Sequence, residues 1–317
     1  MKRISFKRKI QAYYLRDGLL MLAVCLFLVS VNLAQAADMR IAFMSTRIDQ
    51  ENGEIFVMNP DGQTVRRLTK HPQYDASPAW SPDRQKITFM SFRDEHERQG
   101  RVGITGDIWV MNPDGTNPIN LTQSPERWDR SPSWSPDGKQ IIFGSAGFFK
   151  GVVRSDIWVM DADGGNRRNL TNDDAIDVNP DWSPDGKQIA FSSNRDEDGE
   201  KDPDANKDIY VMNADGTNPI NLTNHPARDS GPAWSPDGKQ IAFSSNREGR
   251  HWELDPSENW EVFVMNADGT NLINLTNHPA WDSGPAWEPA PNLSVSPKGR
   301  LATLWGKVKS SNTYDGR

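Results

Sequence analysis

The chain has 317 residues, of which 36% are hydrophobic and 25% charged, and its formal net charge is −7 at pH 7. This acidic balance argues against nucleic acid and anionic membrane surfaces as partners. The single cysteine, Cys25, lies in the first 36 residues, so the remaining chain is expected to be stable without disulfides.

Residues 1–36 have the layout of a secretory signal peptide. Basic residues between Lys2 and Arg16 precede an uncharged apolar run at 18–33, and Ala34-Gln35-Ala36 places small residues at a cleavage site. The alternative is an uncleaved anchor helix, because the apolar run is only slightly shorter than a membrane span. Cleavage after Ala36 predicts a periplasmic or secreted protein with no remaining transmembrane segment.

From residue 40 onward, the chain consists of copies of one unit that begins W-S-P-D-G-K-x-I-A-F and continues with D-I-Y-V-M-N-A-D-G-T-N. Five tryptophans mark the copies at intervals of 54, 48, 52 and 53 residues: Trp80, Trp134, Trp182, Trp234 and Trp287. A period near fifty is typical of propellers and solenoids. Most residues therefore recur for structural reasons, and function is expected in what does not repeat.

Each unit contains four short strand patterns rich in β-branched and aromatic residues, as at 232–235, 239–245, 208–213 and 220–223. Ser-Pro-Asp-Gly and Asn-Ala-Asp-Gly turns join neighbouring strands, and Arg84 replaces the turn glycine in the first full copy. The tryptophans are expected to fill the space between blades. We therefore predict an all-β chain forming a single propeller of four-stranded antiparallel blades.

The order of strands at the two ends predicts how the ring closes. The repeats start at 40–43 with a second-strand sequence and end at 285–287 with a first-strand sequence. Three N-terminal strands and one C-terminal strand would complete a shared blade, giving five blades without exposed sheet edges. The expected domains are a signal peptide (1–36), the propeller (37–291) and a C-terminal hairpin and tail (292–317).

These units resemble the WD-repeat-like propeller units of the TolB family, over residues 40 to about 289. The resemblance implies a periplasmic or extracellular propeller that makes protein–protein contacts. TolB proteins also have a separate amino-terminal domain and six blades. This chain shows five copies, and they begin within a few residues of the predicted cleavage site.

Only the link between the second and third strands varies in length between copies. These links run at 44–54, 90–107, 144–156, 192–208 and 244–261. In an up-and-down blade they share one face of the ring with the connections between blades, and we call this face the variable face. Variable loops on a rigid scaffold are where binding usually resides.

Aromatic, basic and acidic residues mix in these links, as they do in protein-binding surfaces. An ordinary solvated loop is the alternative. The candidate binding residues are Glu95, His96, Arg98, Phe148, Phe149, His251, Trp252 and Glu253.

The link 192–208 also contains oxygen ligands at alternate positions, as calcium loops do. The speculative calcium ligands are Asp202, Asp204, Asn206 and Asp208. The loop lacks the glycine and the later bidentate glutamate of an EF-hand, and Asp208 corresponds to strand-starting aspartates in other copies. An acidic turn with a structural aspartate is therefore the alternative.

The sequence shows no nucleophile elbow, zinc-protease motif or phosphate loop, so no catalytic residue is assigned. The resulting hypothesis is a monomeric, non-catalytic scaffold that binds an envelope or extracellular protein through its variable face. The alternatives are a carbohydrate-active or other hydrolase or lyase with its site over the propeller channel, and a calcium-stabilised structural module.

Overall fold

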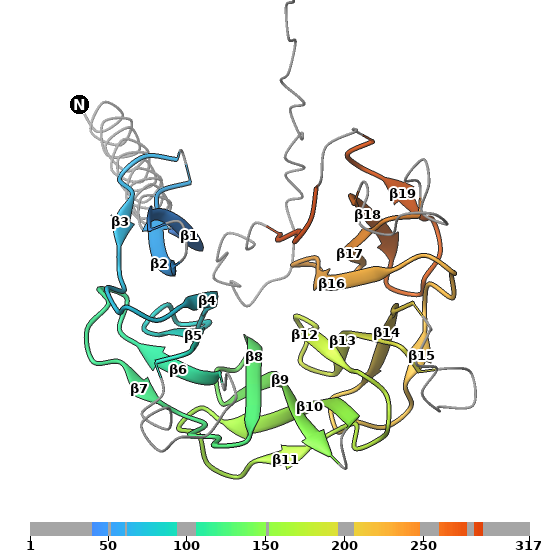
Figure 1. Cartoon of the computed structure of the whole chain (residues 1–317). Coiled ribbons are helices and arrows are strands. Elements are labelled where there is room, and N and C mark those ends of the chain that lie inside the picture. Colours follow the sequence, from blue (N-terminus) through green and yellow to red (C-terminus); the bar gives the residue numbers. More distant parts are fainter. Residues whose placement is uncertain are drawn as a thin grey trace, which may run out of the picture.

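The computed structural model describes residues 40–49, 52–60, 62–93, 106–149, 152–195, 206–247, 260–277 and 282–287. These residues form an all-β propeller of five antiparallel sheets around a central axis, which confirms the predicted fold class and blade number (Figure 1). Within the same residues, no helix has the length and apolar character needed to cross a membrane. The predicted leader and C-terminal tail lie outside them.

Each sheet takes its strands from one continuous stretch of chain. The first sheet contains β1 (Ile41–Asp49), β2 (Asn52–Met58) and β3 (Arg66–Arg67). The second contains β4 (Asp75–Trp80), β5 (Ile87–Ser91), β6 (Asp107–Met111) and β7 (Ile119–Asn120), and the third contains β8 (Arg127–Trp134), β9 (Gln140–Phe149), β10 (Val152–Asp161) and β11 (Arg168–Asn169). The fourth contains β12 (Val178–Trp182), β13 (Gln188–Ser193), β14 (Asp208–Asn213) and β15 (Ile220–Asn221), and the fifth contains β16 (Asp229–Trp234), β17 (Gln240–Ser245), β18 (Glu261–Asn266) and β19 (Ile273–Asn274).

The third strands are buried on both faces because each sheet packs between two neighbours. In β14, Tyr210 and Met212 join a cluster with Ile157 of the preceding sheet, whereas Ile209 and Val211 join a cluster with the following sheet. Successive side chains of a strand point to opposite faces. This alternation explains why the third-strand sequences are apolar on both faces along their central residues.

The repeated tryptophans occupy the space between sheets, as predicted. Trp182 packs against Ile142 and Ile157 of the preceding sheet, and Trp234 packs against Ile209 and Val211 in the same way. Both tryptophans are only 7% exposed. They are therefore core residues and not a surface for stacking a ligand.

The first strands are longer than predicted, because each contains a bulge near the channel. In β16 the pairing with β17 shifts register between Ser230 and Ala233, where Gly231 has φ of 65°. Corresponding bulges place Ser131 at φ of 51° and Asn179 at φ of 53°. A bulge adds one unpaired residue and bends the strand. The bulges thus bend each first strand on its way from the uniform face of the ring to the variable face.

The Ser-Pro-Asp-Gly turns have the predicted geometry. Ser235 O accepts a hydrogen bond of 2.8 Å from Gly238 N, and Gly238 has φ of 69°. Arg84 takes the same left-handed conformation with φ of 59°, although it has a side chain. A Cβ at the matching Gly138 would meet only Pro82 at 3.8 Å, so the cost at Arg84 is conformational and not steric.

Ring closure is the point at which the structure differs from the sequence prediction. The sheet of β1, β2 and β3 has three strands in the described chain, and residues 282–287 do not pair with β1 (Figure 1). That segment instead contacts the fifth sheet, where Gly284 N donates to Ser244 Oγ at 2.9 Å. Gly231 N makes the same bond to Ser192 Oγ in the preceding copy. The segment therefore lies in the first-strand position relative to the preceding blade, without its second-strand partner.

We expect Arg84→Gly to raise the free energy of unfolding by about 1 kcal/mol, because glycine adopts the left-handed conformation without a Cβ penalty. The shift of the urea midpoint at unchanged m-value measures it. Arg84→Ala is the matched control, since it removes the same side chain but keeps the Cβ. An equal gain from both substitutions would contradict the conformational explanation.

We also expect closure of the ring in solution through pairing of Ala286 with Ala42, which matches the Ala233–Ala242 pair of the fifth sheet. The edge strand β1 exposes apolar side chains such as Ile41, and unpaired edges are unfavourable. In a chain that begins at Ala37 and so lacks Cys25, Ala42→Cys combined with Ala286→Cys should form a disulfide on mild oxidation. The out-of-register pair Ile48→Cys with Ala286→Cys should not. Efficient crosslinking of both pairs, or of neither, would argue against this register.

Candidate functional site

Three repeated arginine–aspartate pairs anchor the roots of the variable face. In the fifth sheet, Arg247 Nη2 donates to Asp229 Oδ2 at 2.6 Å and Arg247 Nε donates to Ser245 Oγ at 3.0 Å. The guanidinium also lies over the Phe243 and Phe263 rings, at 5.4 and 5.2 Å. The same arrangement recurs with Arg93–Asp75 and Arg195–Asp177. These pairs are structural, because each joins the first and second strands of one blade.

In the third sheet, a different arginine makes the hydrogen bond to the second-strand serine. Position 147, opposite Arg127 in the ladder, is glycine, and Arg127 Nε donates to Ser145 Oγ at 2.7 Å. The Arg127 guanidinium lies 5.1 Å from the centroid of the Trp158 ring. Asp129 is left without an arginine, and its burial raises the pKa of its carboxyl although Ser145 and Ser124 donate to it.

Asp208, one of the predicted calcium ligands, is occupied by structural donors. Its Oδ1 accepts hydrogen bonds from Thr223 Oγ1 at 2.9 Å and from His225 N at 3.0 Å, and its Oδ2 accepts one from Asn221 Nδ2 at 2.9 Å. Asn206 Nδ2 donates to the carbonyl of Pro226. The other two predicted ligands, Asp202 and Asp204, lie outside the described residues, so the calcium site stays a prediction.

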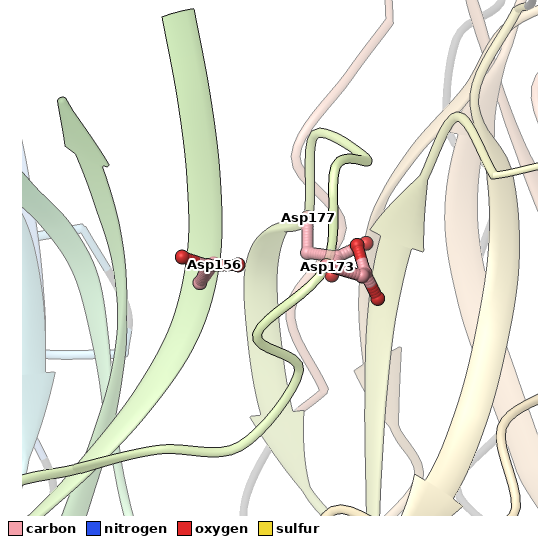
Figure 2. Close-up of side chains that lie close together, drawn as sticks. All are labelled: Asp156, Asp173 and Asp177. Atoms are coloured by element: carbon pink, nitrogen blue, oxygen red, sulfur yellow. The ribbon is translucent and has the colours of Figure 1, made fainter. Parts of the chain in front are cut away.

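An acidic cluster that the sequence analysis missed lies between the third and fourth sheets. Asp156 is in β10, and Asp173 and Asp177 are in the connection that enters β12 (Figure 2). One carboxylate oxygen of each residue lies within 4.8 Å of the others. Asp173 stands where the other copies have His71, Ser124, His225 and His278. Aligning the repeats position by position would have shown this departure.

The charge of this cluster is compensated in part by Arg195. Arg195 Nη2 lies 2.6 Å from Asp177 Oδ2 and 3.0 Å from Asp173 Oδ2. Burial, and then the charge of Asp177, raise the pKa of Asp173 to about 6. Burial likewise raises the pKa of Asp156. Three carboxylates suit a hard divalent cation by ligand type, but Arg195 already bridges two of them. The arrangement instead favours a protonated Asp173 carboxyl up to a pH of about 6.

Lys207 lies close enough to two arginines to respond to their charges. Burial lowers the pKa of Lys207, and the charges of Arg130 and Arg228 lower it further, against an opposing effect of Asp177. Arg130 is half-buried in β8, and among the described residues no carboxylate forms an ion pair with it. An otherwise acidic chain therefore presents a local positive charge here.

A cavity of about 540 Å³ opens beside Arg130, and we call it the aromatic cavity. Phe92 packs against Tyr74 at 5.8 Å and against Trp128 at 6.0 Å between ring centroids. The walls of the aromatic cavity include Met44, Tyr74, Met90, Phe92, Trp128 and Arg130. They come from three neighbouring blades, so no single repeat contains the site.

The structure describes only two of the eight predicted binding residues. Phe148 lies near the end of β9 and is 83% exposed, and the backbone of Phe149 ends that strand. The remaining six lie outside the described residues: Glu95, His96, Arg98, His251, Trp252 and Glu253. The predicted set of binding residues therefore stays a prediction.

Known proteins resemble this chain in sequence and in fold. A family model described as the tricorn protease N-terminal beta propeller domain matches residues 148–249. The structure of TolB from Acinetobacter baumannii superposes with a TM-score of 0.59 at 24% identity, covering 76% of this chain and 53% of that one. The fold is that of a TolB-like β-propeller.

Two curated relatives show the same propeller likeness over part of their length. The uncharacterized peptidase YuxL of Bacillus subtilis is 24% identical over 230 residues, which is 71% of this chain and 30% of YuxL. The Tol-Pal system protein TolB of Alcanivorax borkumensis is 34% identical over 95 residues, which is 30% of this chain and 20% of that protein. The TolB-like chain thus spans less than a third of the length of either relative.

We expect Asp173→Asn to stabilise the protein at about pH 7.5 and to have little effect at about pH 4. The folded-state pKa of about 6 lies above the ordinary value of 3.8, so the folded state binds the proton more tightly. Stability is therefore lost as the pH rises from about 4 to about 6, and asparagine removes that loss. Melting temperatures of both proteins across this range test the expectation.

The control is Asp174→Asn, which removes a negative charge from the neighbouring position, where the side chain is 64% exposed. A pH-independent difference between Asp173→Asn and the unmodified protein would contradict the assignment of the raised pKa to Asp173.

Proposed function

We propose that this TolB-like propeller is a periplasmic or secreted scaffold that binds an envelope protein through its variable face. The signal-peptide pattern of residues 1–36 and the likeness to Tol-Pal system proteins support the compartment and the class of partner. The acidic net charge agrees with a protein partner in preference to nucleic acid.

The projecting hairpin of β9 and β10 is the main structural support for this proposal. Both strands are ten residues long, whereas the equivalent strands of the fourth and fifth sheets have six. Near the tip, Phe148 is 83% exposed, Val152 49% and Val153 44%. Apolar side chains grouped on a rigid projection mark an interaction surface, because leaving them in water is unfavourable.

The extension is held rigidly at its base. β9 pairs with β10 from Gln140–Asp161 to Phe149–Val152 without a register shift. β8 lies on the other side of β9, where Arg127 pairs with Gly147. A preformed projection loses little conformational entropy on binding, which favours affinity.

A hydrolase is the second candidate function, and the raised pKa of Asp173 favours it. Asp173 has a pKa of about 6, close to the pH at which a carboxyl works as a general acid or base. YuxL, which shares the propeller, is named as a peptidase. The Asp173→Asn variant separates the two functions, because it leaves the hairpin tip unchanged.

We expect Phe148→Ser combined with Val153→Ser to lower retention of an envelope partner at least about tenfold, which corresponds to a loss of about 1.4 kcal/mol of binding energy. Residues 37–317 serve as immobilised bait for detergent-solubilised envelope proteins, with quantification of each retained protein. Both side chains are exposed, so the variant should keep the melting temperature of the unmodified bait.

The matched control is Ile220→Ser, since Ile220 is 59% exposed on the outermost strand of the fourth sheet, away from the hairpin. It should retain the partner fully. If every retained protein binds the tip variant and the control equally, the hairpin is not the binding surface.

A further inference from the structure

Within the part of the chain that the structure describes, Arg130 differs from Arg93, Arg195 and Arg247 in having no counter-ion. Arg93, Arg195 and Arg247 each pair with an aspartate of their own blade. Arg130 forms no such pair within the described chain, and its buried Nε has no hydrogen-bond acceptor. Burial lowers the pKa of its guanidinium.

Arg130 is also not required by the repeat. It follows Asp129 at the start of the first strand, and the corresponding positions in the other copies hold Ala76, Val178, Ser230 and Ser283. Small or apolar residues therefore satisfy the fold at this place. Burying a charge without a partner costs free energy, so an arginine here lowers the stability of the free protein.

The aromatic cavity beside Arg130 has the size and lining of a small-molecule site. Its volume of about 540 Å³ lies within the range of roughly 300–1,000 Å³ found for ligand pockets. Tyr74, Phe92 and Trp128 supply aromatic walls, and Met44 and Met90 add adaptable apolar surface. Ser77 and Ser131 provide the hydroxyl groups.

The guanidinium is held in place at the cavity wall. The Arg130 Cζ atom lies 4.8 Å from the centroid of the Trp128 ring, and Trp128 Nε1 donates to Met90 Sδ at 3.3 Å. Stacking on an aromatic face fixes the plane of an arginine and leaves its donors available. A guanidinium presented in this way binds a carboxylate through two parallel hydrogen bonds.

We propose that the aromatic cavity binds a small carboxylic acid with an aromatic or branched apolar body, whose carboxylate pairs with Arg130. A single lining guanidinium and apolar walls suit a monoanion better than a phosphate, which needs more donors. Arg130 and Arg228 both lie near enough to Lys207 to lower its pKa, and this group of positive charges attracts an anion. The site is separate from the hairpin tip and does not depend on the proposed protein binding.

The test compares charged ligands with uncharged isosteres. Phenylacetate, 3-phenylpropionate, 4-phenylbutyrate and 4-methylpentanoate are titrated into residues 37–317 by calorimetry, each beside its primary amide. At least one acid should bind with a Kd of about 1 mM or tighter, and its amide at least about tenfold more weakly. No binding acid at that level, or equal binding of acids and amides, overturns the proposal.

Two substitutions assign the binding to Arg130. Arg130→Met should abolish binding of the acid and raise the melting temperature of the free protein, because it removes the unpaired charge. Arg130→Lys should keep the charge but bind at least about tenfold more weakly, because it loses the paired donors. Lys187→Met, on the opposite face of the ring, is the charge-matched control and should bind normally. Unchanged binding in Arg130→Met overturns the assignment whatever the outcome of the partner experiment.

Discussion

Every sheet of this propeller depends on burial against its neighbours, and that constraint governs the rest of the structure. A single blade has apolar side chains on both faces, as Ile209 and Tyr210 show on β14. It cannot hide both faces alone, so stability arises from stacking. The first sheet contacts β4 on one side, and its edge strand leaves Ile41 42% exposed and Met44 39% exposed. Closing the ring is therefore the step that completes the core.

The sequence was sufficient to predict the parts of the fold that repeat. β14 begins and ends at the predicted residues 208 and 213, and the inter-blade role of Trp182 and Trp234 follows from their spacing. Local patterns determine these features in every copy. The bulges of the first strands were not predicted, because a left-handed Ser131 or Asn179 leaves no mark on the hydrophobic pattern.

The candidate site could be predicted much less well, because its residues come together across blades. Asp156 and Asp173 belong to one repeat, and their carboxylates share a cluster through the packing of β10 against the connection to β12 of the next blade. Arg130 likewise meets Tyr74 only at the junction of neighbouring blades. The reasoning from link length selected residues such as His96 and His251 instead, which lie beyond the described chain.

The departures from the repeat concentrate in one sector, and the third sheet shows how they are connected. Arg127 on β8 takes the place of the arginine that other blades carry at the end of the second strand; position 147 is glycine, and β9 continues past it to Phe149. That continuation lifts Phe148 into solvent. On β8 itself, Arg130 lines the aromatic cavity. The projecting hairpin and Arg130 thus both belong to the third sheet. An exposed phenylalanine, and a half-buried arginine without a counter-ion among the described residues, do not contribute to the stability of the free chain. Both features lie on adjacent strands, so the two proposed sites occupy one sector of the variable face.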